Sequence, residues 1–361
     1  GEEDARVFCA RLGLPASDIE RVAWLVRWHL LMSTTAQRQD ITDPDVVHHF
    51  AELVGHRERL GQLYLLTIAD IIGTSPRLWN GWKDRLLSDL YTATRYALRS
   101  DVELPRDAGV RVRECSEYAL ALLMNEGYAE ADALRVWADF PALSFLRHRP
   151  EQIAWQTGAI LRAQGVVPLV AAHPLSVRGS TELFVYTPDR DGLFATITAM
   201  LDRLRFSVVE SRILSSPTGM ALDTFLLLEA DSQQPASADR TQELQQRLQR
   251  ALAQSAGVEP GKRSMSRHQK HFQMPPQISF HAAGDRTQLA LICTDRPGLL
   301  AAVAQVMLHT EVRVHDARIA TFGERVEDFF QLTDRHNASL GAAQQERLLQ
   351  ALLLRIAPVR D

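Results

Sequence analysis

The sequence predicts a multidomain protein in which an all-α block is followed by two copies of one α+β unit. The main observation is a repeat. Thr181–Leu193 reads TELFVYTPDRDGL and Thr287–Leu299 reads TQLALICTDRPGL, an offset of 106 residues from position 181 to position 287. Before Gly165 apolar residues recur every three or four positions, as in helices, whereas after it they alternate, as in strands.

The N-terminal block is predicted to consist of helices joined by short polar turns. In the first helix, Ile19, Val22 and Val26 form one apolar stripe, and Ser17 is available as the N-cap. Later segments repeat this pattern and open with proline or with a polar residue. The predicted helices are Ser17–Met32, Pro44–Leu53, Glu58–Ile72, Pro76–Leu98, Ser116–Asn125, Glu130–Asp139 and Glu151–Ala163.

Each copy of the α+β unit is predicted to follow the order strand, helix, strand, strand, helix, with one more strand ahead of it. The predicted strands of the first copy are VVPLVAAH, TELFVYT, FSVVESRIL and ALDTFLLLE, and those of the second are QISFHAAG, TQLALICT, VRVHDARIA and VEDFFQLT. The predicted domains are therefore a helical block at residues 1–163, a first α+β domain at 164–258 and a second at 277–361. Residues 259–276 form a basic, proline-containing linker, which we interpret as solvated.

The composition is ordinary for a globular protein, with 46% hydrophobic and 23% charged residues and a formal net charge of −4. Such a charge gives no general attraction to nucleic acid, so no nucleic-acid partner is predicted. No apolar run reaches the roughly 18 residues of a membrane helix, and we expect a cytoplasmic protein without membrane contact. Cys9, Cys115 and Cys293 are expected to be buried thiols, since no Cys-x-x-Cys pair is present.

The repeated loop combines two features that suit a free amino acid. A strand ends at Asp189 or Asp295, and a helix is expected to begin near Gly192 or Gly298. The uncapped N–H groups of the helix suit a carboxylate, and the aspartate suits an ammonium group. The alternative is that aspartate only caps the helix and glycine only turns the chain. Asp191 adds a negative charge to the first loop, so we expect the second loop to bind more tightly.

The strand, the Asp-Arg-x-Gly-Leu loop and the elements after it resemble the ACT domain, a ferredoxin-like βαββαβ module that binds amino acids. Two such domains in tandem cover about residues 179–361. The resemblance implies an amino-acid site at each loop. The implied ligand-binding residues are Asp189, Arg190, Asp191, Gly192, Leu193, Asp295, Arg296, Pro297, Gly298 and Leu299.

Two segments of the helical block resemble one enzyme family closely. VAWLVRWHLLMSTTAQRQDITDP, at Val22–Pro44, and LTIADIIGTSPRLWNGWK, at Leu66–Lys83, are similar to the bifunctional uridylyltransferase/uridylyl-removing enzymes of bacterial nitrogen sensing. That family carries a nucleotidyltransferase domain, an HD-type hydrolase domain and two ACT domains. We therefore expect this chain, which opens directly with helical periodicity, to be the C-terminal portion of such an enzyme.

The resemblance also implies cofactors and partners. The parent enzyme uses UTP and a divalent metal, Mg or Mn, to add uridylyl groups to the PII signalling protein, and its HD domain removes them. Glutamine at the ACT domains is the allosteric effector and favours removal. The chain contains neither the glycine-serine loop nor the paired aspartates of the transferase half, so we expect it to lack a complete catalytic site.

His29 and Asp70 are the candidate catalytic residues of the helical block, and Asp70 is also the candidate metal ligand. Asp70 interrupts the apolar stretch LYLLTIADII, where a buried carboxylate needs a metal or another partner. By resemblance it matches the last aspartate of an HD-type metal site, and His29 matches an additional active-site histidine. His29 lies on the same helical face as Val22 and Val26, where a lone histidine is more often a core residue bonded to the backbone than a ligand. The His-Asp dyad of that family is absent from the block; the dipeptide occurs at His315-Asp316, in the second ACT copy.

Other residues in the helical block have simpler interpretations. His48, His49 and His56 lie in a polar helix and its loop without a carboxylate partner, so no second metal site is predicted. Trp79 and Trp82 are interpreted as packing residues rather than as a nucleotide-stacking surface. Two other identities stay open: a guanosine tetraphosphate synthetase/hydrolase, which also joins HD and ACT modules, and a non-catalytic amino-acid-binding regulator.

Overall fold

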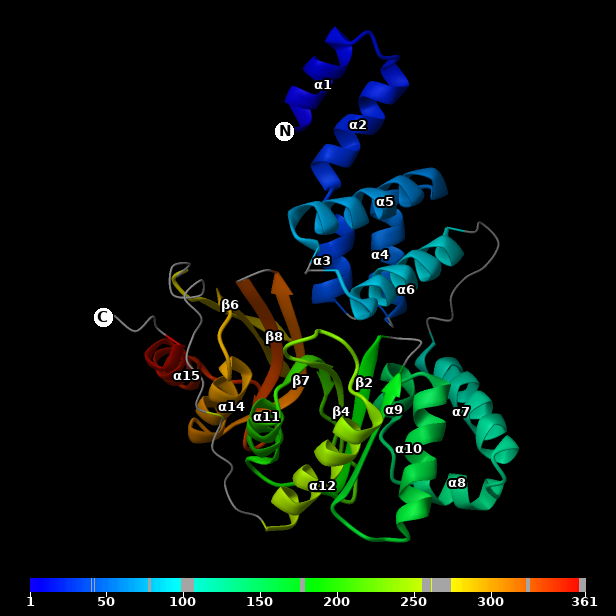
Figure 1. The fold of residues 1–361 in the computed structure, drawn as a ribbon, viewed down its shortest axis with the longest axis vertical. Helices are drawn as coiled ribbons and strands as arrows, with labels where there is room; N and C mark the ends of the chain where they lie inside the picture. Colours follow the sequence, from blue (N-terminus) through cyan, green and yellow to red (C-terminus); the bar gives the residue numbers. More distant parts are fainter. Residues whose placement is uncertain are drawn as a thin grey trace. The chain divides into compact units, whose positions relative to one another are not determined.

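The computed structural model describes residues 1–39, 41, 43–76, 79–98, 107–175, 179–254, 261, 274–322 and 325–356. The chain divides into two compact units, Gly1–Arg113 and Glu114–Asp361. The first unit is helical, and the second carries the whole β-sheet together with the remaining helices (Figure 1). The predicted order, helices followed by α+β structure, is therefore confirmed. The predicted linker falls mostly outside the described residues, apart from Gly261 and Met274–Pro276.

The first unit packs its helices around a core that includes Met32, Phe50, Leu60 and Leu90, all nearly inaccessible to solvent. Burial of each such side chain contributes roughly 1.5–3 kcal/mol. The helices are α1 (Glu2–Arg11), α2 (Ala16–Trp28), α3 (Leu31–Arg38), α4 (Pro44–Val54), α5 (Arg57–Thr74) and α6 (Gly81–Ala97).

Two predicted helix boundaries in this unit were wrong. The helix expected at Ser17–Met32 is two helices with a break at His29, and the residue before its start is Pro15, not Ser17. The apolar stripe runs through this break, so periodicity alone does not reveal it. The helix expected from Pro76 begins at Gly81, because the side chain of Asn80 accepts a hydrogen bond from the Lys83 N–H at 2.9 Å and caps the helix there.

The second unit begins within α7 and continues with three shorter helices before the sheet. Asp107 opens α7 by accepting hydrogen bonds from the N–H groups of Gly109 and Val110 at 2.7 and 3.1 Å. Helix α9 was not predicted, since six residues are too few to establish a period. The bounds are α7 (Ala108–Asn125), α8 (Glu130–Trp137), α9 (Ala142–Arg147) and α10 (Pro150–Ala163).

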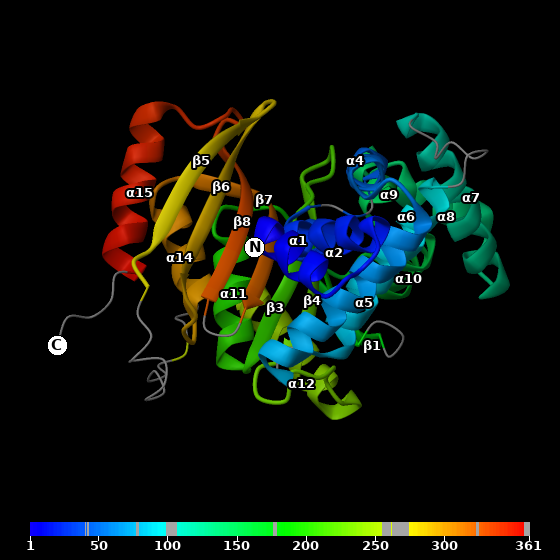
Figure 2. The same cartoon turned by 90° about the horizontal axis from the view of Figure 1, so that it is seen from above.

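The two repeats form one antiparallel sheet of eight strands in the order β1-β2-β4-β3-β7-β8-β6-β5 (Figure 2). Each repeat contributes four strands, and β3 joins β7 through the pairs Glu210↔Arg318 and Arg212↔Asp316. The sequence did not predict this junction. The strands are β1 (Leu169–Leu175), β2 (Ser180–Pro188), β3 (Phe206–Arg212), β4 (Met220–Glu229), β5 (Gln277–Ala283), β6 (Arg286–Thr294), β7 (Val312–Phe322) and β8 (Arg325–Asp334).

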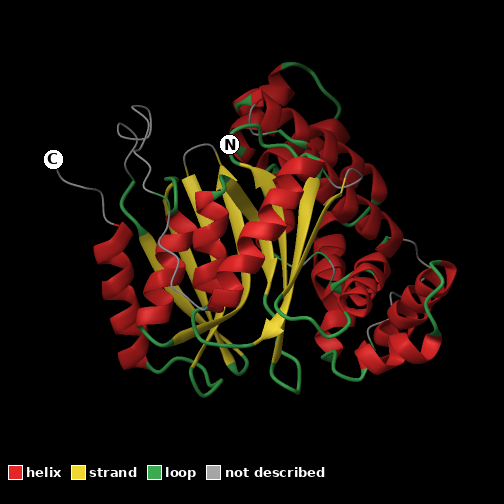
Figure 3. Cartoon of the chain, turned by 60° about the horizontal axis from the view of Figure 1, so that its bottom comes forward, coloured by secondary structure: helices red, strands yellow, loops and turns green. Residues whose placement is uncertain are grey.

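Four helices cover one face of this sheet and enclose a core shared by both repeats (Figure 3). Leu183, Phe225, Leu289 and Phe330 are fully buried in this core, at matching positions of the two copies. The helices are α11 (Leu193–Arg203), α12 (Ala238–Gln254), α14 (Leu299–His309) and α15 (Ala342–Ile356). Because α11 packs against α14, the loop ahead of each helix lies next to the end of the other.

Helix α10 packs against β1 on the sheet of the first repeat, through buried polar contacts. Gln152 donates a hydrogen bond to Glu182 at 2.7 Å, and Gln156 donates one to Thr224 at 3.0 Å. His148 also contacts Thr224, at 3.1 Å. In the described part of the chain, no helix combines the length and the hydropathy needed to cross a bilayer.

Candidate functional site

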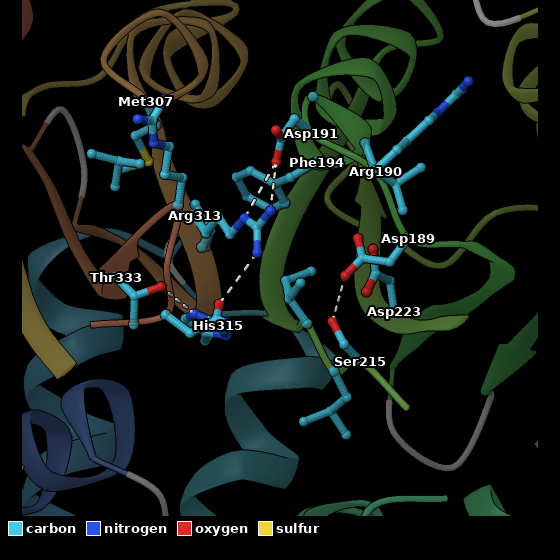
Figure 4. Close-up of a pocket in the computed structure, with 18 of the residues that line it drawn as sticks. Asp189, Arg190, Asp191, Phe194, Ser215, Asp223, Met307, Arg313, His315 and Thr333 are labelled. Carbon is cyan, nitrogen blue, oxygen red and sulfur yellow. Dashed lines mark hydrogen bonds and ion pairs between the residues drawn. The ribbon is translucent and has the colours of Figure 1, made fainter. Parts of the chain in front are cut away.

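A cavity of about 810 Å³ lies where the two repeats meet in the second unit. One wall is formed by the β2–α11 loop and the starts of α11 and β4, all from the first repeat. The opposite wall is formed by the end of α14 and the start of β7, from the second repeat (Figure 4). The cavity therefore exists only because the two repeats of the second unit pack together.

The β2–α11 loop places the start of α11, which has no side-chain cap, at the edge of this cavity. Gly192 is the N-cap of α11 and has a φ of 83°, a conformation that side chains other than glycine rarely adopt. With no side chain at the cap, nothing from that position bonds to the first-turn N–H groups. The N–H groups of Phe194 and Ala195, both lining the cavity, have no acceptor inside the helix. The predicted helix start is confirmed, and its geometry suits an anion.

Two carboxyl groups lie close to this helix start. Asp189 follows β2 and accepts a hydrogen bond from the Ser215 hydroxyl at 2.6 Å. Asp223, on β4, is only 1% exposed, and its side chain lies next to Asp189 in Figure 4. Burial, and then the charge of Asp189, raise the pKa of Asp223 well above its usual value. This part of the cavity is therefore acidic, and it can stabilise a cationic group.

The opposite wall carries basic and neutral polar side chains. Arg313 pairs with Asp191, with distances of 3.3 Å from both Nε and Nη2 to Oδ1, so the charge of Asp191 is compensated. His315 contacts the Thr333 hydroxyl through Nε2 at 2.8 Å. Burial lowers the pKa of His315 to about 4, with further lowering by Arg286 and Arg313, so the ring is neutral at pH 7. The cavity thus has distinct acidic, basic and neutral regions.

The second loop has the same backbone but different surroundings. Gly298 is the N-cap of α14, with a φ of 72°. The carboxylate of Asp202, at the end of α11, faces this glycine, since an added Cβ would lie 3.2 Å from its Oδ2. The same oxygen accepts a hydrogen bond from the Gly261 N–H at 2.8 Å. At the first loop the facing residue is Leu308, the counterpart of Asp202 in the repeat, with its Cδ2 at 3.1 Å from such a Cβ.

Four of the ten predicted ligand-binding residues also make contacts that stabilise the fold, and two of them, Arg190 and Leu193, line the cavity as well. Arg190 donates a hydrogen bond to the Leu252 carbonyl at 3.1 Å, and Arg296 donates one to the Arg355 carbonyl at 2.7 Å. Each arginine thus bonds to a carbonyl near the end of the last helix of its own repeat, where a cation is favourable. Leu193 and Leu299 are buried core residues.

The candidate catalytic residues of the first unit have different environments from those expected. Asp70 lies on α5 and is exposed, so the prediction that burial forces it to have a partner was wrong. Position 70 continues the buried stripe of Leu60, Leu63 and Thr67 at helical spacing, but it lies in the last part of α5, where residues 69–74 are exposed or half-buried. His29 is half-buried, and its Nδ1 lies 2.8 Å from the Val26 carbonyl, as in the simpler interpretation. No cluster of three metal-binding side chains occurs among the residues that the structure describes.

The remaining sequence interpretations can be compared directly with the structure. His56 caps α5, its Nδ1 accepting a hydrogen bond from the Arg59 N–H at 3.4 Å. Trp82 is buried, and Trp79 packs against the core of the first unit, as predicted. The three cysteines, Cys9, Cys115 and Cys293, are buried and free, which confirms that prediction.

Sequence reasoning missed three residues that line the cavity: Asp223, Arg313 and His315. One available signal was Asp223, a carboxylate in the interior of the apolar strand ALDTFLLLE. His315 was noticed only as part of a His-Asp dipeptide. It lies at a β-bulge, because the register of β7 shifts between Val314 and Asp316, and a bulge redirects a side chain. A bulge has no reliable sequence signature.

A cavity with convergent polar groups between two copies of an α+β unit has the form in which proteins commonly bind small molecules. Comparison with known proteins narrows this class. Residues 107–159 match the family model described as uridylyltransferase GlnD fifth domain. The chain is 48% identical over 366 residues to the bifunctional uridylyltransferase/uridylyl-removing enzyme of Xanthomonas campestris pv. campestris (strain B100). It is 40% identical over 358 residues to the enzyme of the same name from Methylococcus capsulatus (strain ATCC 33009 / NCIMB 11132 / Bath).

These alignments cover 99% and 98% of this chain but 41% of each relative. The predicted resemblance is confirmed: over nearly its whole length, the chain is a homologue of the bifunctional uridylyltransferase/uridylyl-removing enzymes. The chain spans about two fifths of the length of these relatives.

Proposed function

We propose that the second unit is the amino-acid-sensing region of a uridylyltransferase/uridylyl-removing enzyme, with two ACT domains that bind glutamine. The observation that carries the proposal is the first loop. It places an uncapped helix start beside the Asp189 and Asp223 carboxyl groups, within one cavity. A free amino acid carries one negative and one positive group a few ångströms apart, which matches this arrangement. The relatives' names supply the parent activities.

The ligand carboxylate is proposed to bind at the N–H groups of Phe194 and Ala195, and its ammonium group at Asp189. The side chain of the ligand then extends toward His315 and Thr333, which are neutral and can exchange hydrogen bonds with an amide. Burial of an unpaired carboxylate beside the neutral side chains of His315 and Thr333 would be unfavourable. The arrangement therefore favours glutamine over glutamate.

The first loop is the better candidate site, in contrast to the preference inferred from sequence. That preference rested on the charge of Asp191, which is paired with Arg313 in the structure. At the second loop the carboxylate of Asp202 already lies against Gly298, near the start of α14. An internal carboxylate there opposes the binding of a second one by charge repulsion.

Isothermal titration calorimetry of this chain with L-glutamine tests the sensor proposal. We expect saturable binding, and weaker binding of L-glutamate by about tenfold, since each 1.4 kcal/mol of lost interaction is a factor of ten. The affinity for free glycine, which has both charged groups but no side chain, measures the contribution of the ammonium and carboxylate groups of the ligand. Absence of heat with all three amino acids, together with absence of a ligand-induced shift in melting temperature, would refute the proposal.

For the first unit we propose a part of the hydrolase site of the full-length enzyme, which acts on the uridylylated PII protein. Asp70 would hold a divalent metal, Mg or Mn, together with residues that this chain does not contain, and His29 would lie nearby. The exposure of Asp70 on α5 is compatible with this role, because its carboxylate is available to a further domain or to a metal. UTP is the proposed substrate of the parent transferase activity, and a cytoplasmic location stays a prediction.

The change Asp70→Asn in the full-length enzyme tests this second proposal. Loss of a metal ligand is expected to reduce uridylyl removal by about 100-fold or more, while uridylyl transfer stays within about twofold. Asp84→Asn, in the first turn of α6, is a control of the same chemistry in the same unit. Equal hydrolase activity of the Asp70→Asn enzyme and the parent would show that this carboxylate is not part of the site.

A further inference from the structure

The most unusual group in the cavity is the carboxyl of Asp223. Its side chain is 1% exposed, it lines the cavity, and neither of its oxygens has a hydrogen bond of normal geometry to any residue that the structure describes. The Leu214 N–H approaches it and favours the charged form only weakly. An ionised carboxylate in this position costs several kcal/mol unless it has a partner. An aspartate at this buried position therefore does not stabilise the folded protein by itself, and a ligand could supply the missing partner.

The surroundings of Asp223 indicate the charge of that partner. The charge that acts on Asp223 is that of Asp189, whose other contact is the Ser215 hydroxyl. Arg190, the basic residue next to Asp189, bonds to the Leu252 carbonyl instead. Across the cavity, Arg313 is paired with Asp191, and His315 is paired with Thr333. Two neighbouring carboxyl groups, one of them buried, make a site for a cation.

We infer that the ammonium group of the ligand binds between Asp189 and Asp223, and that Asp223 releases its proton to solvent as the ligand enters. This inference rests on the proposed amino-acid site and adds a residue and a proton to it. In the free protein the Asp223 O–H bond keeps the buried group neutral. On binding, that bond breaks, the proton goes to water or buffer, and the resulting carboxylate accepts an N–H bond from the ligand ammonium.

A physical consequence is that the affinity for the amino acid should decrease as the pH is lowered. Below the pKa of Asp223 in the free protein, binding an ammonium must first remove a proton, so affinity falls as pH falls. Above that pKa the carboxylate is already charged, and affinity becomes independent of pH until the amino group of the ligand itself loses its proton.

The experiment is calorimetry of the full chain with L-glutamine at one pH, in phosphate and in Tris, whose ionisation enthalpies differ. Proton release appears as a difference between the two observed enthalpies, and we expect up to about one proton per ligand. Des-amino glutamine, which lacks the ammonium group, is expected to release none. With Asp223→Asn we expect about 10- to 100-fold weaker binding of L-glutamine and no buffer dependence.

Asp328 offers a matched control, because it is the counterpart of Asp223 in the second repeat. The pairs Val185↔Asp223 and Leu291↔Asp328 occupy the same register, and both aspartates are 1% exposed. Asp328→Asn is expected to leave the affinity and the proton release unchanged. Circular dichroism checks that both variants fold; if Asp223→Asn does not, the buffer dependence of the parent protein decides alone.

The outcomes separate this inference from the proposed function. If L-glutamine binds without a buffer-dependent enthalpy, or if des-amino glutamine releases the same number of protons, the inference fails while the sensor proposal stands. If no amino acid binds at all, the sensor proposal itself fails. Equal losses on Asp223→Asn and Asp328→Asn would also overturn the inference, since they would indicate a general effect on the sheet.

Discussion

The two repeated loops of this protein share a backbone but differ in almost everything that surrounds it. At the first loop, Leu308 faces Gly192, and the cavity is completed by Arg313 and His315. At the second loop Asp202 faces Gly298, and the repeat counterparts of Arg313 and His315 are Ser207 and Val209. Duplication preserved the turn and the helix start, whereas the opposite wall, supplied by the other copy, diverged.

This difference shows that the residues available to bind a ligand at the loop of one repeat are supplied partly by the other repeat. The sequence around Asp189 and around Asp295 is nearly the same, yet the residue of the opposite helix that faces the glycine is Leu308 at the first loop and the carboxylate of Asp202 at the second. A carboxylate near a helix N-terminus is favourable by about 0.3–1 kcal/mol at exposed sites and by more when partly buried. The second loop thus has from its own chain the interaction that the first loop offers to a ligand.

The largest expected effect comes from making the first loop resemble the second. Leu308→Asp places a carboxylate against Gly192, where we propose that the ligand carboxylate binds. Repulsion and competition for the same N–H groups are expected to weaken L-glutamine binding by about 100-fold, measured by calorimetry. Leu308 is 36% exposed, so the protein is expected to tolerate the change.

Two further variants sharpen this comparison. Leu308→Asn has nearly the same size as Leu308→Asp but no charge, and should cost much less affinity. Asp202→Asn, the reciprocal change at the second loop, should leave binding at the first loop within about twofold. If Asp202→Asn weakened binding as strongly as Leu308→Asp, the assignment of the ligand to the first loop would be wrong.

The parts that the sequence revealed are those with a local physical signature. The repeat and the helix starts after Gly192 and Gly298 follow from periodicity and from the backbone freedom of glycine, and the buried cysteines follow from the absence of a Cys-x-x-Cys pair. The β3–β7 junction was hidden, because strand pairing between repeats depends on packing and leaves no spacing in the sequence. The exposure of Asp70 was also misjudged, because its spacing places it on the buried side of α5, whereas the last part of that helix, residues 69–74, is exposed or half-buried.

The cavity shows the same limit. Asp189 was identified because it belongs to the repeated motif, but Arg313 and His315 come from a strand more than a hundred residues away. The packing of α11 against α14 and the pairing of β3 with β7 bring the two sets together. Cavity residues that come from the opposite repeat are thus difficult to predict from a single sequence.

A smaller expected effect concerns the pH dependence of stability. His315 lies at the bulge of β7, and its repeat counterpart Val209 lies at the matching bulge of β3. The pKa of His315 is lowered from 6.5 to about 4, so the folded state keeps the ring neutral while the unfolded state takes up a proton. The stability that depends on the neutral ring is complete above pH 6.5 and is lost as pH falls toward 4. Relative to the parent, His315→Val should therefore gain about 2 kcal/mol in free energy of unfolding between pH 7 and pH 5.

Urea unfolding of the parent and of the His315→Val variant at both pH values measures this difference, and other titrating groups cancel in the comparison. His281→Val, at an exposed position of β5, is the control for the loss of an imidazole that is not buried. A difference between His315→Val and the parent that stays constant from pH 7 to pH 5 would mean that the ring is accessible to protons in the folded protein. In that case the wall of the cavity opposite Asp189 would be charged in mild acid, and its proposed preference for a neutral side chain would be confined to higher pH.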